Sequence, residues 1–153
     1  RDDSCCKLRQ NSQAFYGKEI IRMKLDGLGI FVHDMPTMIR FYRDVLGFEI
    51  QEPEDTINVY LIKDGTLFMF YPRKEFEKFA NRSFNVATGV NGHYEIALSV
   101  DTYDDVDKEY ERLISLGVTP IYAPTTQPWG QRTCYIAVPE GNLIEIGSFH
   151  KNE

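Results

Sequence analysis

The sequence has few cysteines, no long apolar run and no excess of basic residues. Its cysteines, Cys5, Cys6 and Cys134, form neither a disulfide framework nor a zinc-binding spacing, which favours a reducing, cytoplasmic setting. No apolar run approaches the ~20 residues that cross a bilayer, so no membrane partner is expected. The net charge of −6 argues against a nucleic-acid partner, because phosphate binding requires a basic face.

The first 22 residues also lack the apolar periodicity of the rest of the chain. They contain no apolar segment of signal-peptide length, so residues 1–22 are expected to be a leader or a disordered arm, with the patterned part opening at Met23. The remaining chain is predicted to comprise a first module over 23–72, a linker or flap over 73–92, a second module over 93–149 and a tail over 150–153.

Two stretches, Gly27–Phe48 and Glu95–Val118, repeat one pattern. Each begins with an alternating strand, passes through an Asp-containing turn and continues as an amphipathic helix. Both helices stop at Leu-Gly, where the glycine suits the left-handed conformation that ends many helices. The strands align at an offset of 68 residues, from Val32 to Val100. The chain therefore contains two copies of one unit.

Each predicted helix is followed by three short strand-like runs. They are Glu49–Gln51, Ile57–Ile62 and Thr66–Tyr71 in the first unit, and Val118–Tyr122, Thr133–Val138 and Asn142–Phe149 in the second. Asp64-Gly65 predicts a hairpin, and Thr102 with Asp105 predicts a capping box on the second helix. The expected fold is α+β: two β-α-β-β-β modules whose curved antiparallel sheets surround a shared cavity, with one helix outside each.

Alternation along the strands assigns one face to the helix and the other to the cavity. By this parity the cavity is lined by aromatic side chains, polar side chains and two carboxylates: Phe31, Asn58, Tyr60, Phe68, Phe70, Glu95, Tyr135 and Glu145. Inward carboxylates need a metal ion, a cationic ligand, an Arg partner or water, because buried unpaired charge is costly. Trp129 and Arg132 open a strand on this cavity, either to stack on and pair with an anionic or planar ligand or, for Arg132, to neutralise a carboxylate.

Three stretches carry a family resemblance: GIFVHDMPTMIRFYRDVLGF, HYEIALSVD and PWGQRTCYIAVPEGNLIEI. In their paired β-α-β-β-β context they resemble the vicinal-oxygen-chelate superfamily, which comprises glyoxalases, bleomycin-resistance proteins and dioxygenases. The resemblance covers about Leu25 to Phe149, nearly all of the patterned chain. It indicates the superfamily but does not choose among its activities.

In metal-dependent members of this superfamily, the ligands come from the first and last strands of each unit. The resemblance places these positions at Gly27 and Phe68 in the first unit and at Glu95 and Glu145 in the second. Glycine and phenylalanine carry no ligand atom, so an intact four-ligand centre is not expected. Glu95 and Glu145, with His93 on the face of Glu95, form the candidate set for a divalent ion (Zn, Ni, Mn, Fe or Mg); alternatively, His93 caps a strand at the surface.

Three functions remain open. The first is a small-molecule-binding protein, similar to bleomycin-resistance proteins, that sequesters a planar or cationic ligand by stacking and cation–π contacts. The second is a divalent-metal-dependent lyase, isomerase or dioxygenase using Glu95 and Glu145, with Glu145 as the candidate general base. The third is a structural or regulatory module with a vestigial cavity. The resemblance also implies a homodimer, with the modules paired within one chain or across two.

Overall fold

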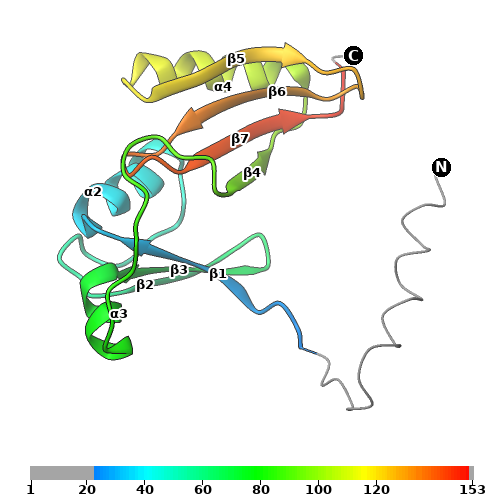
Figure 1. The fold of residues 1–153 in the computed structure, drawn as a ribbon. Helices are drawn as coiled ribbons and strands as arrows, with labels where there is room; N and C mark the ends of the chain where they lie inside the picture. Colours follow the sequence, from blue (N-terminus) through cyan, green and yellow to red (C-terminus); the bar gives the residue numbers. More distant parts are fainter. Residues whose placement is uncertain (1–22, 152–153) are drawn as a thin grey trace.

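The computed structural model describes residues 23–151 of the chain (Figure 1). The leader or arm predicted over residues 1–22 lies outside the described residues, as do residues 152 and 153 of the predicted tail. Among the described helices, none is long and apolar enough to cross a membrane.

The first unit forms a three-stranded sheet with a helix on one face. Its elements are β1 (Gly27–Val32), α2 (Met35–Arg40), the π-helical turn η1 (Phe41–Val45), β2 (Val59–Lys63) and β3 (Thr66–Pro72). The strand order is β1-β3-β2. The predicted hairpin is confirmed at Asp64 and Gly65, both of which have positive φ.

The strand predicted at Glu49–Gln51 is not formed. Local hydrogen bonds hold this segment in a turn, because the amide of Phe48 donates to the Tyr42 carbonyl at 2.8 Å and that of Ile50 to the Phe48 carbonyl at 2.8 Å. Phe48 and Ile50 are also buried, at 3% and 4% exposure. Their burial in the core takes the place of strand pairing at this point.

The second unit forms a four-stranded sheet in the order β4-β7-β6-β5. Its elements are β4 (Glu95–Ser99), α4 (Tyr103–Ser115), β5 (Thr119–Thr126), β6 (Arg132–Ala137) and β7 (Leu143–Ser148). The predicted capping box is confirmed, since Thr102 and Asp105 exchange side-chain and backbone hydrogen bonds at the start of α4. Gly117 ends the helix region with φ +81°, as the Leu-Gly signal predicts.

Both sheets are mixed, so the prediction of antiparallel sheets holds only in part. The first and last strands of each unit run parallel, as β1 with β3 and β4 with β7. The remaining pairs are antiparallel. Parallel pairing places residues of the first and last strands side by side on one face, which brings together the positions considered as a candidate site.

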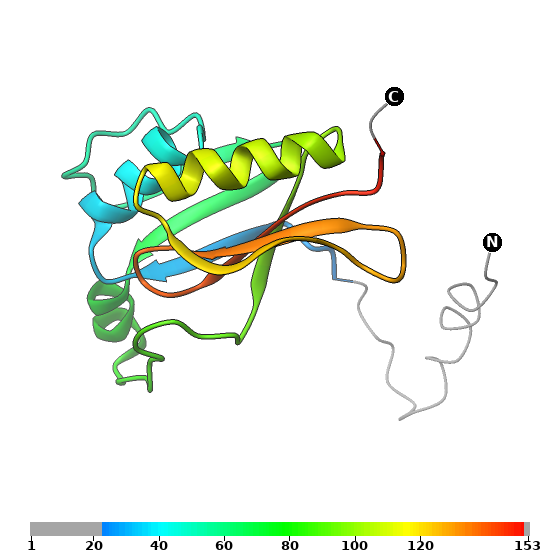
Figure 2. The same cartoon turned by 90° about the horizontal axis from the view of Figure 1, so that it is seen from above.

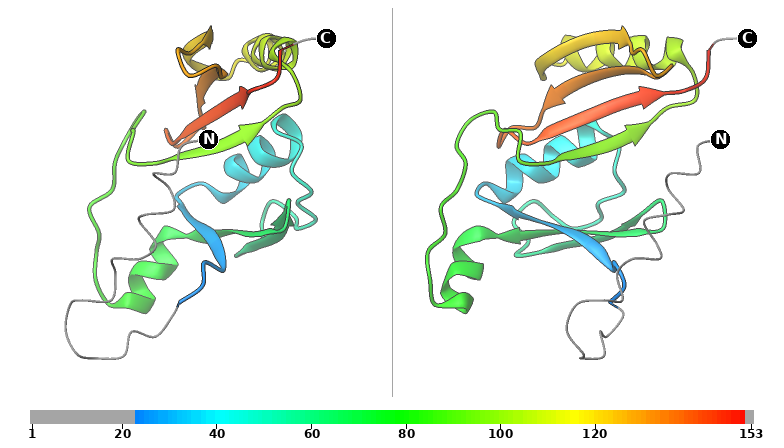
Figure 3. Two further views of the ribbon diagram at one scale, coloured as in Figure 1. Left: turned by 90° about the vertical axis from the view of Figure 1, so that its right-hand side faces the viewer. Right: turned by 45° about the vertical axis from the view of Figure 1, so that its right-hand side comes forward.

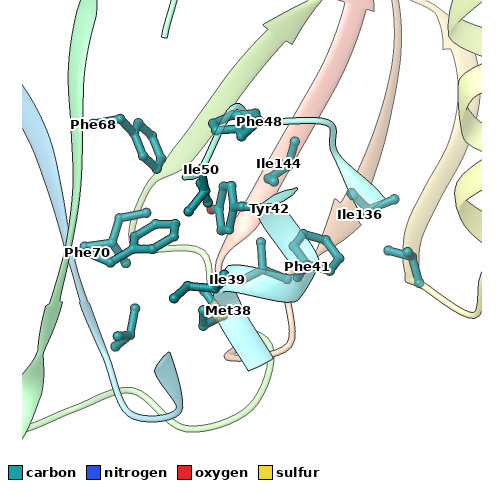
Figure 4. Close-up of a cluster of buried hydrophobic side chains, with 14 of the residues drawn as sticks. Met38, Ile39, Phe41, Tyr42, Phe48, Ile50, Phe68, Phe70, Ile136 and Ile144 are labelled. Atoms are coloured by element: carbon teal, nitrogen blue, oxygen red, sulfur yellow. The ribbon is translucent and has the colours of Figure 1, made fainter. Parts of the chain in front are cut away.

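Helix α2 lies between the two sheets, and α4 packs on the four-stranded sheet on the same side of the strands as α2 (Figures 1 and 3). In η1, which follows α2, Tyr42 packs against Phe68 and Phe70 of β3, and Phe41 lies on the side of Ile136 of β6 (Figure 4). The shared helix layer thus joins the two units through one core. The described strands form no closed barrel, and the sheet faces turned away from the helices stay open.

The segment between the units contains α3 (Arg73–Ala80), which packs on β1 and β3. Seen from above, α3 and α4 lie on opposite sides of the strands (Figure 2). The ring of Phe76 on α3 lies 4.4 Å from that of Phe31 on β1. This part of the linker therefore covers the open face of the three-stranded sheet at its β1 edge.

Candidate functional site

The open face of the four-stranded sheet carries both predicted carboxylates, and we call it the acidic face. In the register of β4, β7 and β6, Glu145 lies between Ala97 and Tyr135. Glu95 reaches the same place, because the Tyr135 hydroxyl donates a hydrogen bond to it. The acidic face is thus defined by Glu95, Glu145 and Tyr135, which parity placed together correctly.

The two carboxylates act on one another electrostatically. Burial and the negative charge of Glu95 raise the pKa of Glu145 above its ordinary value, and the hydrogen bond from Gln131 opposes this shift. Burial, the hydrogen bond to Glu95 and the charge of Glu145 raise the pKa of Tyr135. Among the described residues neither carboxylate has a basic partner, so the acidic face favours a cation.

A hydrogen-bonded relay connects Glu145 to the only tryptophan of the chain. Gln131 donates from Nε2 to Glu145 Oε1 at 3.0 Å and accepts at Oε1 from Trp129 Nε1 at 3.0 Å. Gly147 leaves room for this amide, because a Cβ there would stand 2.8 Å from Gln131 Nε2. Sequence parity missed Gln131, since it precedes β6 and belongs to no strand.

A stacked pair of tyrosines borders the acidic face. The rings of Tyr122 on β5 and Tyr135 on β6 lie 5.3 Å apart at 17°. The Tyr122 hydroxyl is bonded to Thr133 Oγ1 at 2.8 Å and receives a hydrogen bond from Gln127. Sequence analysis missed Tyr122 as a neighbour of Tyr135, because register shifts along β5 disturb simple alternation. The pair supplies a flat aromatic wall beside the carboxylates.

A groove of about 320 Å³ opens on this face. Glu145 and Gln131 line it together with Ala97 and Ser99 of β4 and with His150, which follows β7. A groove of this size lies at the low end of small-molecule sites, which span ~300–1,000 Å³. Of the three residues that define the acidic face, Glu145 lines the groove, while Glu95 and Tyr135 lie outside its lining.

The sequence-based expectation for Arg132 is wrong. Its guanidinium binds Asp107 of α4, with Nε and Nη2 each 2.8 Å from Oδ1. Neighbouring Thr133 shares the parity of Tyr135, so Arg132 points to the opposite face, toward the helix. Arg132 therefore neither neutralises a carboxylate of the acidic face nor reaches a ligand there. Trp129 stays on the acidic side, 65% exposed, through its bond to Gln131.

The cavity orientation predicted for Phe68 and Phe70 is also wrong. Both rings are buried in the core, at 4% and 0% exposure, and pack against Tyr42. The register of β1 with β3 pairs Gly29 with Met69. The open face of β3 therefore consists of Leu67, Met69 and Tyr71. Shifting a strand by one residue exchanges the residues on its two faces. The sequence alignment of β3 with the last strand of the second unit was shifted in this way.

Phe31 and Tyr60 lie on the open face of the three-stranded sheet as predicted, 44% and 47% exposed. The Tyr60 and Tyr71 hydroxyls share a hydrogen bond of 2.5 Å. Asn58 lies just before β2, half-buried, with its carbonyl accepting from Thr56 Oγ1 at 3.0 Å. We call this surface the aromatic face, defined by Phe31, Tyr60 and Tyr71. Its role in ligand binding stays a prediction.

The donor set does not fit the divalent metal centre that the superfamily implies. With the corrected register, the first unit contributes Gly27 and Met69, neither of which has an oxygen or nitrogen ligand atom in its side chain. His93 lines a different groove from Glu145. Within residues 23–151, no three His, Cys, Asp or Glu side chains are arranged to hold a metal ion.

Comparison with known proteins identifies the family. The virulence protein STM3117 of Salmonella typhimurium is 27% identical over 135 residues, which cover 86% of this chain and 88% of that protein. A glyoxalase/bleomycin resistance protein/dioxygenase family enzyme from Burkholderia phytofirmans matches with a TM-score of 0.69 at 26% identity, over 82% of this chain and 98% of that one.

A glyoxalase/bleomycin resistance protein/dioxygenase from Nocardioides has the same fold, with a TM-score of 0.70 at 19% identity over 86% of this chain and 87% of that one. The family model described as Glyoxalase/Bleomycin resistance protein/Dioxygenase superfamily matches residues 24–146. The match covers both units and the segment between them. The chain belongs to the glyoxalase/bleomycin resistance protein/dioxygenase superfamily.

Proposed function

We propose that this protein binds a planar, cationic small molecule on the acidic face. The observation that carries the proposal is the pair Glu95 and Glu145, held together beside the stacked rings of Tyr122 and Tyr135. A ligand cation offsets both the burial and the charge of Glu95, which together raise the pKa of Glu145, and its ring stacks on the tyrosines. A cytoplasmic location, expected from the cysteine pattern, belongs to the same proposal.

The proposal extends to a homodimer in which two copies complete one cavity. Phe31, Tyr60 and Ile62 leave the first unit's open face apolar, at 44%, 47% and 66% exposure. Large exposed apolar patches mark surfaces that other molecules cover. Covering the acidic face of one copy with Tyr60, Tyr71 and Ile62 of the other, while Phe31 stays beneath α3, would enclose the carboxylates in aromatic walls. In such a dimer the open sheet faces of the two copies would close around a cavity that the described part of a single chain does not enclose.

The ligand-binding role is tested with N-methylquinolinium, a planar cation, and with quinoline as its neutral counterpart near pH 7.5. Titration of the full chain is followed by calorimetry and by the fluorescence of Trp129, which is bonded to Gln131 beside Glu145. We expect the cation to bind more tightly than quinoline and Glu145→Gln to weaken it roughly tenfold. Glu111→Gln, an exposed change of the same charge on α4, is the matched control.

Three results would overturn this assignment. Equal binding of the cation by the wild type and by Glu145→Gln removes the acidic face as its site. If the purified wild type contains stoichiometric divalent metal and Glu145→Gln contains none, the acidic face serves a metal-dependent function instead of binding an organic cation. If neither the cation nor a metal binds, the remaining hypothesis is that the protein is a structural or regulatory module.

The dimer is tested separately by sedimentation velocity. Ile62→Glu places a charge on the aromatic face and is expected to shift the protein to monomers. Ile57→Glu is the matched control, because Ile57 is 68% exposed but lies in the loop before β2. A monomeric wild type, or equal association of the two variants, contradicts the proposed interface.

The raised pKa of Glu145 favours a second candidate, an isomerase or lyase in which this carboxylate accepts a proton from the substrate. A general base works best when its pKa approaches the working pH, and burial beside Glu95 moves Glu145 in that direction. Proton exchange of a bound carbonyl compound in D₂O, followed by NMR and lost in Glu145→Gln, supports this candidate. Exchange at the same rate in both proteins excludes it.

A further inference from the structure

A second groove, larger than that of the acidic face, lies between β1, α3 and the segment that follows α3. It encloses about 570 Å³, well within the ~300–1,000 Å³ of small-molecule sites. Its lining includes Phe31, Arg73, Phe76, Phe84, His93 and Tyr94. None of its lining residues borders the groove beside Glu145. The two grooves are therefore separate sites on one chain.

Three phenylalanines, from β1, from α3 and from the loop that follows α3, form one wall of this groove. The ring of Phe76 lies 4.4 Å from Phe31 at 32° and 5.5 Å from Phe84 at 23°. Phe31 and Phe84 nevertheless remain 44% and 39% exposed, so their surfaces are open to a ligand. Phe76 is stacked on Phe84 and tilted against Phe31, and the exposed ring faces offer offset stacking to a further planar ring.

Arg73, the first residue of α3, brings a positive charge to this wall. Its side chain is only 24% exposed, and its nearest carboxylate oxygen, Glu140 Oε2, lies 3.9 Å from Nη2, beyond hydrogen-bond distance. Glu140 is held elsewhere, since its Oε1 accepts the backbone amides of His33 and Asp34, each at 2.7 Å. Within the described part of the chain, the Arg73 guanidinium makes no hydrogen bond.

We propose that this groove binds a planar aromatic monocarboxylate. The ring stacks on Phe31 and Phe76, and the carboxylate accepts a charge-assisted hydrogen bond from Arg73. Nη2 faces Glu140, so the ligand accepts from Nη1 or from Nε, which lie on different edges of the guanidinium. The charge of Glu140 beside the guanidinium disfavours dianions, so the site selects a single carboxylate.

The experiment is calorimetric titration of the full chain with 1-naphthoate and with the uncharged 1-naphthalenemethanol. We expect one naphthoate per chain and weaker binding of the alcohol. Arg73→Gln is expected to weaken naphthoate roughly tenfold or more, because a charge-assisted hydrogen-bonding partner is lost. Lys74→Gln, an exposed change of the same charge that does not line the groove, is expected to bind like the wild type.

The outcome is independent of the cation site proposed above. Glu145→Gln is expected to leave naphthoate binding unchanged, and Arg73→Gln to leave N-methylquinolinium binding unchanged. The inference is overturned if naphthoate does not bind, if Arg73→Gln binds it as tightly as the wild type, or if Glu145→Gln abolishes it. If Arg73→Gln does not fold, the comparison of naphthoate with the alcohol and the loss of binding in Phe76→Leu decide the question.

Discussion

Gly27 lies so close to Leu67 that a Cβ atom built on the glycine would stand 2.6 Å from the Leu67 carbonyl oxygen and 2.8 Å from its Cβ. The two residues are register partners in the parallel pair of β1 and β3. Backbone atoms in a paired strand yield little, so this position accepts no side chain without moving the strands. Strand packing therefore closes the first metal-ligand position of the superfamily in this chain.

This contact predicts that Gly27→Ala destabilises the protein by about 1–3 kcal/mol, the usual cost of overpacking. Gly29→Ala is the matched control on the same strand, because its Cβ would meet only Met69 Cε at 3.7 Å. Urea denaturation of the two variants measures the difference. For the same reason, Gly27→His is expected to unfold more readily without gaining metal. Equal stability of Gly27→Ala and Gly29→Ala would show that β1 and β3 separate easily.

Local signals predicted much of the fold because they depend on neighbouring residues. The capping box at Thr102 and the hairpin at Asp64-Gly65 are confirmed by their own hydrogen bonds and backbone angles. The turn that replaces the strand predicted at Glu49–Gln51 was not predictable, because it depends on Phe48 packing against Tyr42 and Phe68. The alternation of apolar and polar residues along one strand carries no information about such contacts between elements.

Which residues share the candidate site could be predicted from the sequence only where the pairing register of the strands could be predicted as well. Glu95, Tyr135 and Glu145 were placed on the same face of the sheet correctly because parity was counted within the second unit, while their roles stay a prediction. Met69 was missed in favour of Phe68 because both faces of β3 are largely apolar, so the strand offers no charged residue to mark the open side.

A second prediction concerns Gly147, which makes room for Gln131. Gly147→Ala would place a Cβ 2.8 Å from Gln131 Nε2 and push this amide away from Glu145. We expect a small loss of stability, about 1 kcal/mol, and a shifted Trp129 emission, because Trp129 is bonded to the same amide. Gly92→Ala, whose Cβ would meet only Leu143 Cδ1 at 3.9 Å, serves as control. Unchanged emission in Gly147→Ala would mean that Gln131 does not hold this position.

A third prediction concerns the buried hydroxyl of Tyr42. This oxygen has no hydrogen-bond partner among the described residues, although the side chain is fully buried. An unsatisfied buried hydroxyl costs about 1–3 kcal/mol, so Tyr42→Phe is expected to raise the free energy of unfolding by about 1 kcal/mol. Denaturation in urea measures the change. A loss of stability of similar size would instead indicate a hydrogen bond from a buried water.

The last prediction follows from the raised pKa of Glu145. A folded-state pKa above the ~4.3 of a free glutamate means that the folded chain holds this proton more tightly than the unfolded chain. The stabilisation associated with protonated Glu145 is therefore complete below pH ~4.3 and is lost as the pH rises through the raised value.

Glu145→Gln removes this titration and the repulsion from Glu95. Relative to the wild type, we expect the variant to gain stability as the pH rises above ~4.3, by on the order of 0.5 kcal/mol near pH 7. Thermal denaturation of both proteins from pH 4 to pH 7 measures this difference, and it cancels the contributions of carboxylates such as Asp34, whose lowered pKa acts in the opposite direction. Glu111→Gln controls for net charge. A variant that loses stability relative to the wild type as the pH rises would mean that ionised Glu145 is stabilised in the folded chain, which contradicts the raised pKa that burial and the charge of Glu95 give it.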